Sequence, residues 1–182
     1  MVYVFLADGF EEIEALASVD FLRRVGVSVK TASLKGKTAI GAHNIEVVAD
    51  INIDDVTLNE DVEAVILPGG MPGSQNLYEC VKVHEAIDYA INSNKLVCAI
   101  CAAPFILGRK GLLKNKKATC FPGFEEELFG AEISKDFVVK DGNFITAKGM
   151  GSAIEFGLQI AEMLTNPLEV KKIRASLQIY NG

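Results

Sequence analysis

The chain has 182 residues, of which 49% are hydrophobic and 23% are charged, and its formal net charge is −6. This composition is typical of a single folded domain over residues 1–182 and excludes a disordered chain, a coiled coil and a collagen-like repeat. The negative charge disfavours a nucleic-acid partner, and no uncharged apolar run reaches the about 20 residues of a membrane-spanning helix.

Strand and helix patterns alternate over the first two thirds of the chain. A strand is predicted at Val2–Leu6, and the helix that follows it, Glu11–Val25, is ended by Gly26. A turn is predicted over Gly36–Gly41. The further strands are predicted at Val27–Leu34, Ile45–Val48, Ala64–Leu67 and Leu96–Ile100, and the further helices at Val83–Ile91 and Ala102–Leu107.

The last third is less regular but continues the pattern. Asp141-Gly142 predicts a hairpin between the strands Phe137–Lys140 and Asn143–Ala147. The other elements expected here are a short strand at Lys117–Cys120, a short helix at Phe124–Phe129, and helices at Gly151–Leu164 and Leu168–Gln178. The alternation favours an α/β fold with a mostly parallel sheet and helices on both faces. Sites in such folds form at the carboxyl ends of the strands.

Cys101 is the first candidate for chemistry. It directly follows the predicted strand Leu96–Ile100 and precedes Ala102-Ala103 at the start of a helix. A nucleophile on a sharp strand-to-helix turn needs small neighbours, because the turn brings backbone segments close together. The positive end of the helix favours a thiolate, so we expect the pKa of Cys101 to lie below the free value of about 8.5. A buried structural cysteine is the alternative interpretation.

Cys98 and Cys101 together form a C-x-x-C pattern, which can mark a redox dithiol. Cys98 lies inside the predicted strand, however, and strand residues three apart point to opposite faces. This placement disfavours both a disulfide and a metal pair. The four cysteines of the chain are too few for a disulfide scaffold, so we expect reduced thiols in a cytoplasmic protein.

Three carboxylates, Glu11, Glu12 and Glu14, open the first predicted helix. The helix dipole favours negative charge there, which is a sufficient structural reason for Glu11 and Glu12. Glu14 lies near the carboxyl end of the first strand, on the rim where a site is expected. A solvated carboxylate is the alternative for Glu14.

Two glycine-rich turns complete the candidates. Leu67-Pro68-Gly69-Gly70-Met71-Pro72-Gly73 follows a buried strand, and its glycines let a ligand approach backbone N–H groups, as in an oxyanion hole. Lys148-Gly149-Met150-Gly151 by itself indicates only the start of a helix. The two histidines, His43 and His84, are not placed beside Cys101, so a Cys–His pair is not supported.

Taken together, these segments resemble the ThiJ/PfpI family, and within it the branch of the parkinsonism-associated protein deglycase. The resemblance covers nearly the whole chain and rests on Ala7-Asp8-Gly9-Phe10-Glu11-Glu12-Ile13-Glu14, Leu67-Pro68-Gly69-Gly70, Ala99-Ile100-Cys101-Ala102-Ala103-Pro104 and Gly149-Met150-Gly151. It implies a flavodoxin-like sandwich, a homodimer and a reactive cysteine, with no cofactor or metal. By position it implies that Cys101 is the nucleophile, that Glu14 is its carboxyl partner, and that Gly70 and Ala102 supply the N–H groups of an anion pocket.

The chain departs from this family pattern at Phe121. The deglycase branch often has a histidine downstream of the nucleophile, and Phe121 stands at the matching place. A histidine acid–base is therefore missing. The peptidase-like branch has a histidine directly after the cysteine, where this chain has Ala102, and the related amidotransferases have a late histidine that this chain lacks. Peptidase and amidotransferase chemistry are therefore not expected.

The resulting hypothesis is covalent chemistry on small α-oxoaldehydes, or on the adducts that they form with proteins or nucleotides. The Cys101 thiolate attacks the aldehyde carbon, the N–H groups of Gly70 and Ala102 hold the oxyanion, and Glu14 carries the proton. Two adjacent anions cannot both ionise cheaply, so Glu14 is expected to be protonated when Cys101 is a thiolate. The alternatives are a redox-stress sensor with an oxidisable cysteine and a chaperone, both without turnover.

Overall fold

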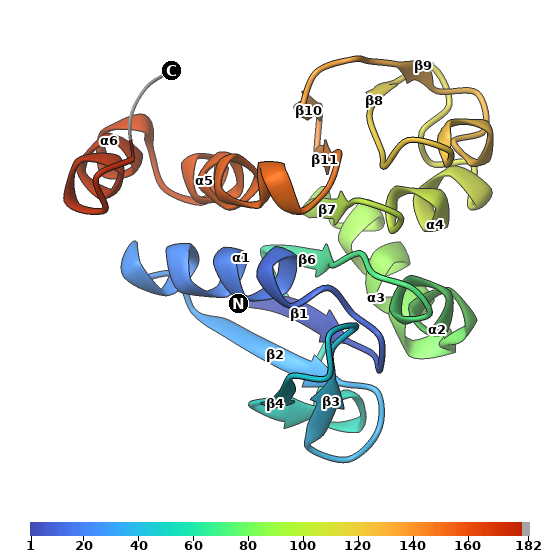
Figure 1. Ribbon diagram of the computed structural model, residues 1–182, viewed down its shortest axis with the longest axis horizontal. Helices are drawn as coiled ribbons and strands as arrows, with labels where there is room; N and C mark the ends of the chain where they lie inside the picture. The colour runs from blue at the N-terminus through green and yellow to red at the C-terminus, as the bar shows by residue number, and fades with distance from the viewer. Residues whose placement is uncertain (180–182) are drawn as a thin grey trace.

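A seven-stranded sheet forms the centre of the computed structural model, which describes residues 1–179 (Figure 1). The strands run in the order β10-β11-β7-β6-β1-β2-β5, and every neighbouring pair is parallel except β10 and β11. Their bounds are β1 (Val2–Leu6), β2 (Val29–Ser33), β5 (Ile51–Asn52), β6 (Ala64–Leu67), β7 (Leu96–Ile100), β10 (Val138–Asp141) and β11 (Phe144–Ala147). Without the two outer strands, the order is that of a flavodoxin-like fold, 2-1-3-4-5. The predicted α/β sandwich is therefore confirmed.

Helices cover both faces of this sheet. The α-helices are α1 (Glu12–Arg24), α2 (Gly73–Glu79), α3 (Val81–Asn92), α4 (Pro104–Arg109), α5 (Ala153–Leu164) and α6 (Pro167–Ser176). The short 3-10 helices are η1 (Ile53–Asp55), η2 (Glu125–Glu127) and η3 (Met150–Ser152). Two small strand pairs complete the fold, antiparallel β3 (Thr38–Ile40) with β4 (Glu46–Val48), and parallel β8 (Lys117–Ala118) with β9 (Glu132–Ile133).

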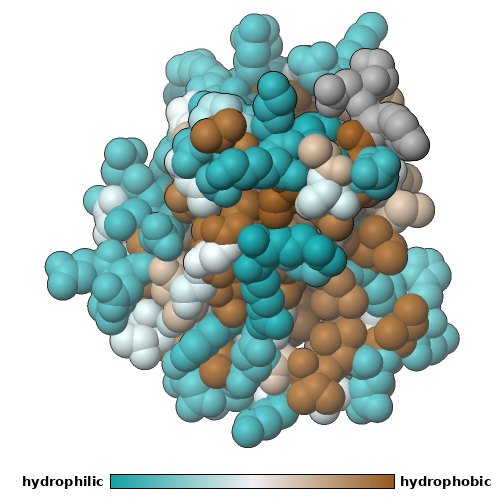
Figure 2. Space-filling view, turned by 90° about the vertical axis from the view of Figure 1, so that its left-hand side faces the viewer, coloured by the Kyte–Doolittle hydropathy of each residue, from teal (hydrophilic) through white to brown (hydrophobic). Residues whose placement is uncertain are grey.

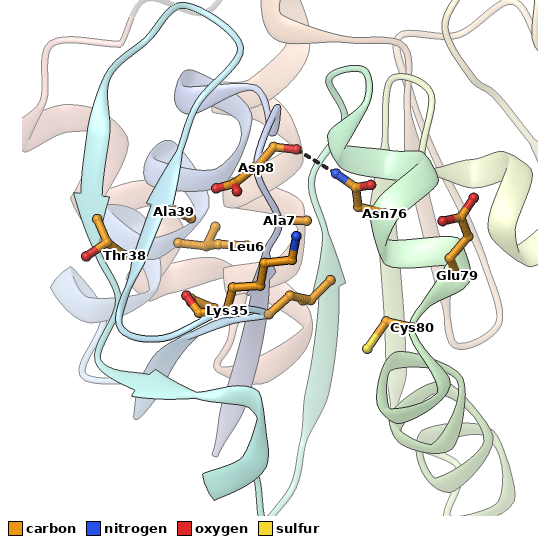
Figure 3. Close-up of a pocket in the computed structure, with 11 residues that line it drawn as sticks. Leu6, Ala7, Asp8, Lys35, Thr38, Ala39, Asn76, Glu79 and Cys80 are labelled. Atoms are coloured by element: carbon orange, nitrogen blue, oxygen red, sulfur yellow. Dashed lines mark hydrogen bonds between the residues drawn. The ribbon is translucent and has the colours of Figure 1, made fainter.

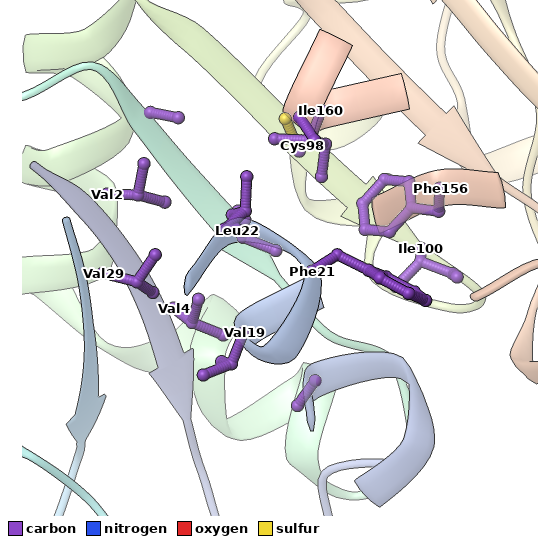
Figure 4. Packing of buried hydrophobic residues seen from close by; sticks show 14 of the residues in the cluster. Val2, Val4, Val19, Phe21, Leu22, Val29, Cys98, Ile100, Phe156 and Ile160 are labelled. Atoms are coloured by element: carbon purple, nitrogen blue, oxygen red, sulfur yellow. The ribbon is translucent and has the colours of Figure 1, made fainter. Parts of the chain in front are cut away.

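The alternation of side chains along β1 separates two cores. Val2, Val4 and Leu6 share a core with α1, α5 and α6, whereas Tyr3 and Phe5 share the other with α2, α3 and α4. Figure 4 shows the first core, in which the side chains of β1 and β7 meet those of α1 and α5. Both cores consist of large apolar side chains that are almost completely buried. This burial makes the sheet a rigid support for the loops at its edges.

The carboxyl ends of the parallel strands lie together at one end of the molecule, toward the right in Figure 1. The order of the strands reverses there, because β1 lies between β2 and β6. Ligands bind at such a switch point in open α/β sheets. Figure 2 looks onto the opposite end, where polar side chains surround apolar ones gathered in the middle of the face.

Some local predictions were wrong. Thr38–Ile40 forms strand β3 inside the segment predicted as a turn, and α2 begins at Gly73, inside the glycine-rich turn, where the sequence does not indicate a helix. Both elements are short and packed against the ends of the sheet, so tertiary contacts outweigh their local propensities. No helix within residues 1–179 is long and apolar enough to cross a membrane.

Candidate active site

Cys101 forms the turn that joins β7 to the segment before α4. Its φ is 65°, in the left-handed region that residues other than glycine rarely adopt. Its N–H donates to the carbonyl oxygen of Ala147 at 2.8 Å, and its own carbonyl oxygen accepts from the N–H of Phe121 at 2.7 Å. These two bonds hold an unfavourable backbone conformation from both sides, as is typical of functional sites. The predicted sharp turn is confirmed, and the side chain is only partly buried.

The loop after β6 approaches Cys101 very closely, which only glycine permits. A Cβ atom at Gly69 would lie 2.4 Å from the Cβ of Cys101 and 2.5 Å from Oε2 of Glu14. Gly70 has a φ of 86°, and a Cβ there would lie 2.4 Å from the carbonyl oxygen of Gly9. As a result, the backbone N–H of Gly70 faces the sulfur of Cys101, as does that of Ala102.

The carboxyl group of Glu14 lies beneath this loop and is not solvated. The residue is 1% exposed, and its Oε2 accepts a hydrogen bond from the N–H of Gly69 at 2.8 Å. Oε1 is also buried and has no hydrogen-bond partner among residues 1–179. It faces Gly149, where a Cβ atom would lie 3.8 Å from it. The solvated alternative is therefore wrong, and the structure brings Glu14, Cys101, Gly70 and Ala102 together.

The surroundings of Glu14 raise its pKa toward neutral pH. Burial, followed by the charge of Glu11, raises the pKa of Glu14 to about 7, although Cys101 and the N–H of Gly69 lower it in part. A carboxyl group with this pKa can accept and return a proton under ordinary conditions. Glu14 is therefore suited to proton transfer beside a thiol.

The pKa of Cys101 shifts in the direction opposite to the sequence-based expectation. Burial and the negative charge of Glu14 raise the pKa of the thiol to about 12, and the N–H groups of Gly70 and Ala102 offset this only in part. The expected helix dipole is weak, because α4 begins at Pro104 and has only six residues. Protonation of Glu14 removes the repulsion, so the thiolate is favoured when Glu14 holds the proton.

The other two carboxylates of the acidic run support the start of α1. Glu11 is its N-cap and accepts the N–H of Glu14 at 2.7 Å. Glu12 is buried, where it accepts the N–H of His43 and pairs with its Nδ1, both at 2.8 Å. Donor atoms of Glu11, Glu12 and His43 lie within 4.8 Å of one another, but each carboxylate is already hydrogen-bonded within the fold.

Phe121 lies at the edge of the site, next to Gly149. The residue is 48% exposed, and its Cδ2 lies 3.3 Å from the place where a Cβ at Gly149 would be. Phe121, Pro122, Phe137, Gly149 and Met150 are among the residues that line an open depression of about 430 Å³, which adjoins the turn at Cys101 through the hydrogen bond from Phe121 to the Cys101 carbonyl oxygen. The sequence alone indicates no role for Gly149 or Met150, because each becomes part of the site only through contacts with distant segments.

A separate cavity of about 230 Å³ lies between β3 and α2 (Figure 3). Asp8, Lys35 and Glu79 are among its lining residues, and Asn76 donates to the carbonyl oxygen of Asp8 at 2.9 Å. Neither Cys101 nor Glu14 lines this cavity. It shares no lining residue with the depression near Cys101.

The four cysteines, all within residues 1–179, are free and form no disulfide. Cys98 is completely buried in β7, in the core with α1 and α5 (Figure 4), and burial raises its pKa. The predicted place of Cys98 inside a strand is confirmed and both thiols are free, although Cys101 packs against the same core as Cys98 and not on the opposite face of the sheet.

Comparison with known proteins gives consistent matches. Residues 1–163 match the model of the DJ-1/PfpI family. The chain is 35% identical over 182 residues to protein dj-1beta of Drosophila melanogaster, covering 98% of this chain and 97% of that protein. It is 34% identical over 159 residues to the glutathione-independent glyoxalase DJR-1.2 of Caenorhabditis elegans, covering 86% and 84% of the two chains. The solved structure of oxidized Toxoplasma gondii DJ-1 is similar with a TM-score of 0.93 and 34% identity, covering 98% of each chain.

Proposed function

Since the chain belongs to the DJ-1/PfpI family, we propose that it is a cofactor-independent enzyme that converts α-oxoaldehydes into hydroxy acids. The observation that carries this proposal is the grouping around one thiol. Cys101 is held at a strained turn, its sulfur faces two backbone N–H groups, and a buried carboxyl group lies beside it. The name of the similar glyoxalase supports the same class of reaction.

The reaction begins when the sulfur of Cys101 attacks the aldehyde carbon. The new S–C bond forms a hemithioacetal, and the electrons of the C=O bond move onto its oxygen. The N–H groups of Gly70 and Ala102, which favour negative charge on the sulfur, are the donors that would stabilise that oxyanion. Fixed backbone dipoles in a partly buried site are effective here, because they do not reorganise during the reaction.

The oxyanion first takes the proton that Glu14 holds during the attack, which completes the hemithioacetal hydroxyl and leaves Glu14 ionised. Glu14 then transfers a proton between the two carbons of the substrate. It removes the proton from the hemithioacetal carbon to give an enediol, and returns a proton to the neighbouring carbon to give a thioester. Water hydrolyses this thioester, which releases the hydroxy acid and restores the thiol. A pKa of about 7 and an Oε1 atom that has no hydrogen-bond partner within residues 1–179 fit both directions of transfer.

The same chemistry extends to adducts in which an amine is bound to the aldehyde carbon. The thiolate would then displace the amine from this carbon: the S–C bond forms and the C–N bond breaks. The partial exposure of Cys101 and the open depression beside it support access by groups attached to a larger molecule.

The decisive experiment measures conversion of methylglyoxal to lactate. We expect Cys101→Ser to abolish turnover, and Glu14→Gln to lower kcat by about a hundredfold or more, the usual effect of losing an acid–base group. Cys80→Ser, which removes another partly buried thiol, should leave kcat unchanged. Absence of turnover in the unmodified protein, or full turnover in Cys101→Ser, would contradict the proposal.

Redox sensing is the second candidate function. Its support is that the partly exposed Cys101 faces two N–H donors, which could also hold the oxygens of an oxidised sulfur. Treatment with peroxide, followed by mass analysis of the Cys101 peptide, would detect addition of two oxygen atoms. A holdase activity that survives in Cys101→Ser would instead favour the chaperone alternative.

We also propose that the protein is a cytoplasmic homodimer. Ile13 is 51% exposed and Ile154 is 46% exposed, each in the first turn of its helix, and α1 packs directly on α5. Such a pair of exposed apolar side chains supports a contact between copies. The four free thiols support a reducing compartment. Sedimentation velocity of the unmodified protein and of Ile13→Glu would test the dimer.

A further inference from the structure

We propose that the depression beside Cys101 binds the apolar part of the substrate, and that the preferred substrates are α-oxoaldehydes with an aromatic or branched hydrocarbon group. This inference rests on the proposed function and adds the identity of the group next to the ketone carbon. Methylglyoxal, whose group is a single methyl, would then be converted with a lower kcat/KM than these aldehydes.

The position of the depression carries the first part of the argument. Phe121 donates its N–H to the carbonyl oxygen of Cys101 at 2.7 Å, and Cys101 donates its N–H to Ala147 at 2.8 Å. Two segments that line the depression, around Phe121 and just after Ala147, are thus tied directly to the reacting residue. Gly149 in turn faces Oε1 of Glu14. A substrate bound covalently to the sulfur would therefore extend toward this depression.

The chemistry of the lining carries the second part. Phe121, Phe137 and Met150 are 48%, 71% and 56% exposed, although large apolar side chains are usually buried. Exposed apolar side chains that gather around one hollow indicate a binding surface. The volume of about 430 Å³ lies within the range of about 300–1,000 Å³ for small-molecule pockets. A three-carbon aldehyde would occupy only a small part of it.

The polar groups on the rim do not compete with this assignment. Lys148 is the charged residue of the lining, and its ammonium group donates to the carbonyl oxygen of Lys135 at 2.7 Å. The same group lies 5.2 Å from the centre of the Phe137 ring. Lys148 therefore helps to position Phe137, and the surface left for the substrate is aromatic and aliphatic.

Phe121 determines the shape of this surface. Its ring lies at the junction between the depression and the site, against Gly149, where any side chain would narrow the space between the Phe121 ring and Glu14. A flat apolar ring can stack on an aromatic substrate group but cannot exchange protons. Phe121 is therefore a specificity-determining residue in this proposal.

The first experiment compares kcat/KM for phenylglyoxal and methylglyoxal, whose products are mandelate and lactate. We expect the ratio to favour phenylglyoxal by about tenfold or more, the discrimination typical of apolar pockets. Phe121→Ala should lower that ratio about fivefold or more, because it removes the stacking surface. Phe129→Ala is the matched control, since Phe129 is 54% exposed but does not line the depression. An unchanged ratio in Phe121→Ala would overturn the proposal.

The second experiment does not depend on turnover. Cys101 is alkylated with 2-bromoacetophenone or bromoacetone, which form the same S–C bond with loss of bromide but carry a phenyl or a methyl group. Each rate is divided by the rate with free glutathione. We expect the phenyl reagent to be favoured in the unmodified protein and in Phe129→Ala, but not in Phe121→Ala. Equal ratios in all three would overturn the assignment of the depression. Failure to turn over either aldehyde would contradict only the proposed enzymatic function.

Discussion

The carbonyl oxygen of Cys101 accepts the backbone N–H of Phe121 at 2.7 Å. Because this bond uses only main-chain atoms, it holds position 121 beside the thiol whatever side chain that position carries. The chain has Phe121 where the family branch often has a histidine, and this difference thus changes only a side chain and not the backbone that positions it.

Phe121→His should therefore place an imidazole at the edge of the site without altering the fold. We expect kcat for methylglyoxal to rise, by about tenfold or more, because a positioned acid–base group is added. The pH profile of kcat should gain a new inflection near the histidine value of about 6.5. An unchanged kcat with no new inflection would mean that the imidazole does not reach the reacting atoms.

The raised pKa of Glu14 predicts that folding stability falls as pH rises. The unfolded chain loses the Glu14 proton near the ordinary value of 4.5, whereas the folded protein keeps it up to about 7. Stability from this group is therefore fully present below 4.5, declines between 4.5 and about 7, and is lost above that. The difference corresponds to about 3 kcal/mol.

Urea unfolding of the unmodified protein and of Glu14→Gln at several pH values would check this decline. Glu14→Gln should lack this decline. The free energy of unfolding of Glu14→Gln, relative to that of the unmodified protein, should therefore be higher at pH 8 than at low pH. Glu46→Gln, which changes an exposed carboxylate on β4, should keep the decline. An identical pH dependence in Glu14→Gln would show that another group causes it.

Glu14 also controls the acidity of Cys101. Its negative charge is among the causes that raise the pKa of the thiol, so Glu14→Gln should shift the pH midpoint of Cys101 alkylation downward. Iodoacetamide rates at a series of pH values, followed at the Cys101 peptide by mass spectrometry, would report this shift. A midpoint that stays in place or moves upward would contradict the repulsion between the two groups.

Gly69→Ala should disrupt the site and the fold together. Its Cβ would lie 2.4 Å from the Cβ of Cys101, so the loop after β6 must move. We expect a loss of about 1–3 kcal/mol of stability, as for other overpacked positions, together with loss of turnover. Thermal unfolding would check the stability, with Gly151→Ala as the control because open space surrounds that position. Retention of full stability in Gly69→Ala would show that the loop after β6 can move away from Cys101 without a loss of stability.

Most of the parallel strands of the sheet were predictable from the sequence because their signals are local, but β5, which has only two residues, was not predicted. The continuous apolar runs of β6 and β7 and the Asp141-Gly142 turn depend on neighbouring residues only. Helix α2 was not predicted, because Pro72 and Gly73 are typical of a turn and the helix is stabilised by packing against α3 and β1. The strand-to-helix turn at Cys101 likewise follows from the small residues around it.

The electrostatics of the site could not be predicted in the same way. The burial of Glu14 depends on Gly69 and Gly149, which reach it from two other parts of the chain. The pKa of Cys101 depends on that burial and on the charge of Glu14, and both oppose the helix effect that the sequence suggested. Long-range contacts, which no local pattern contains, therefore decide the direction of both shifts.

The hydrogen bond from Cys101 to Ala147 has a consequence for biosynthesis. A ribosome makes Glu14 first, Cys101 later, and the strand that contains Ala147 near the end of the chain. Until that last strand pairs with β7, the turn at Cys101 lacks one of the bonds that hold it. The left-handed turn at Cys101 is therefore held from both sides only once the sheet is completed.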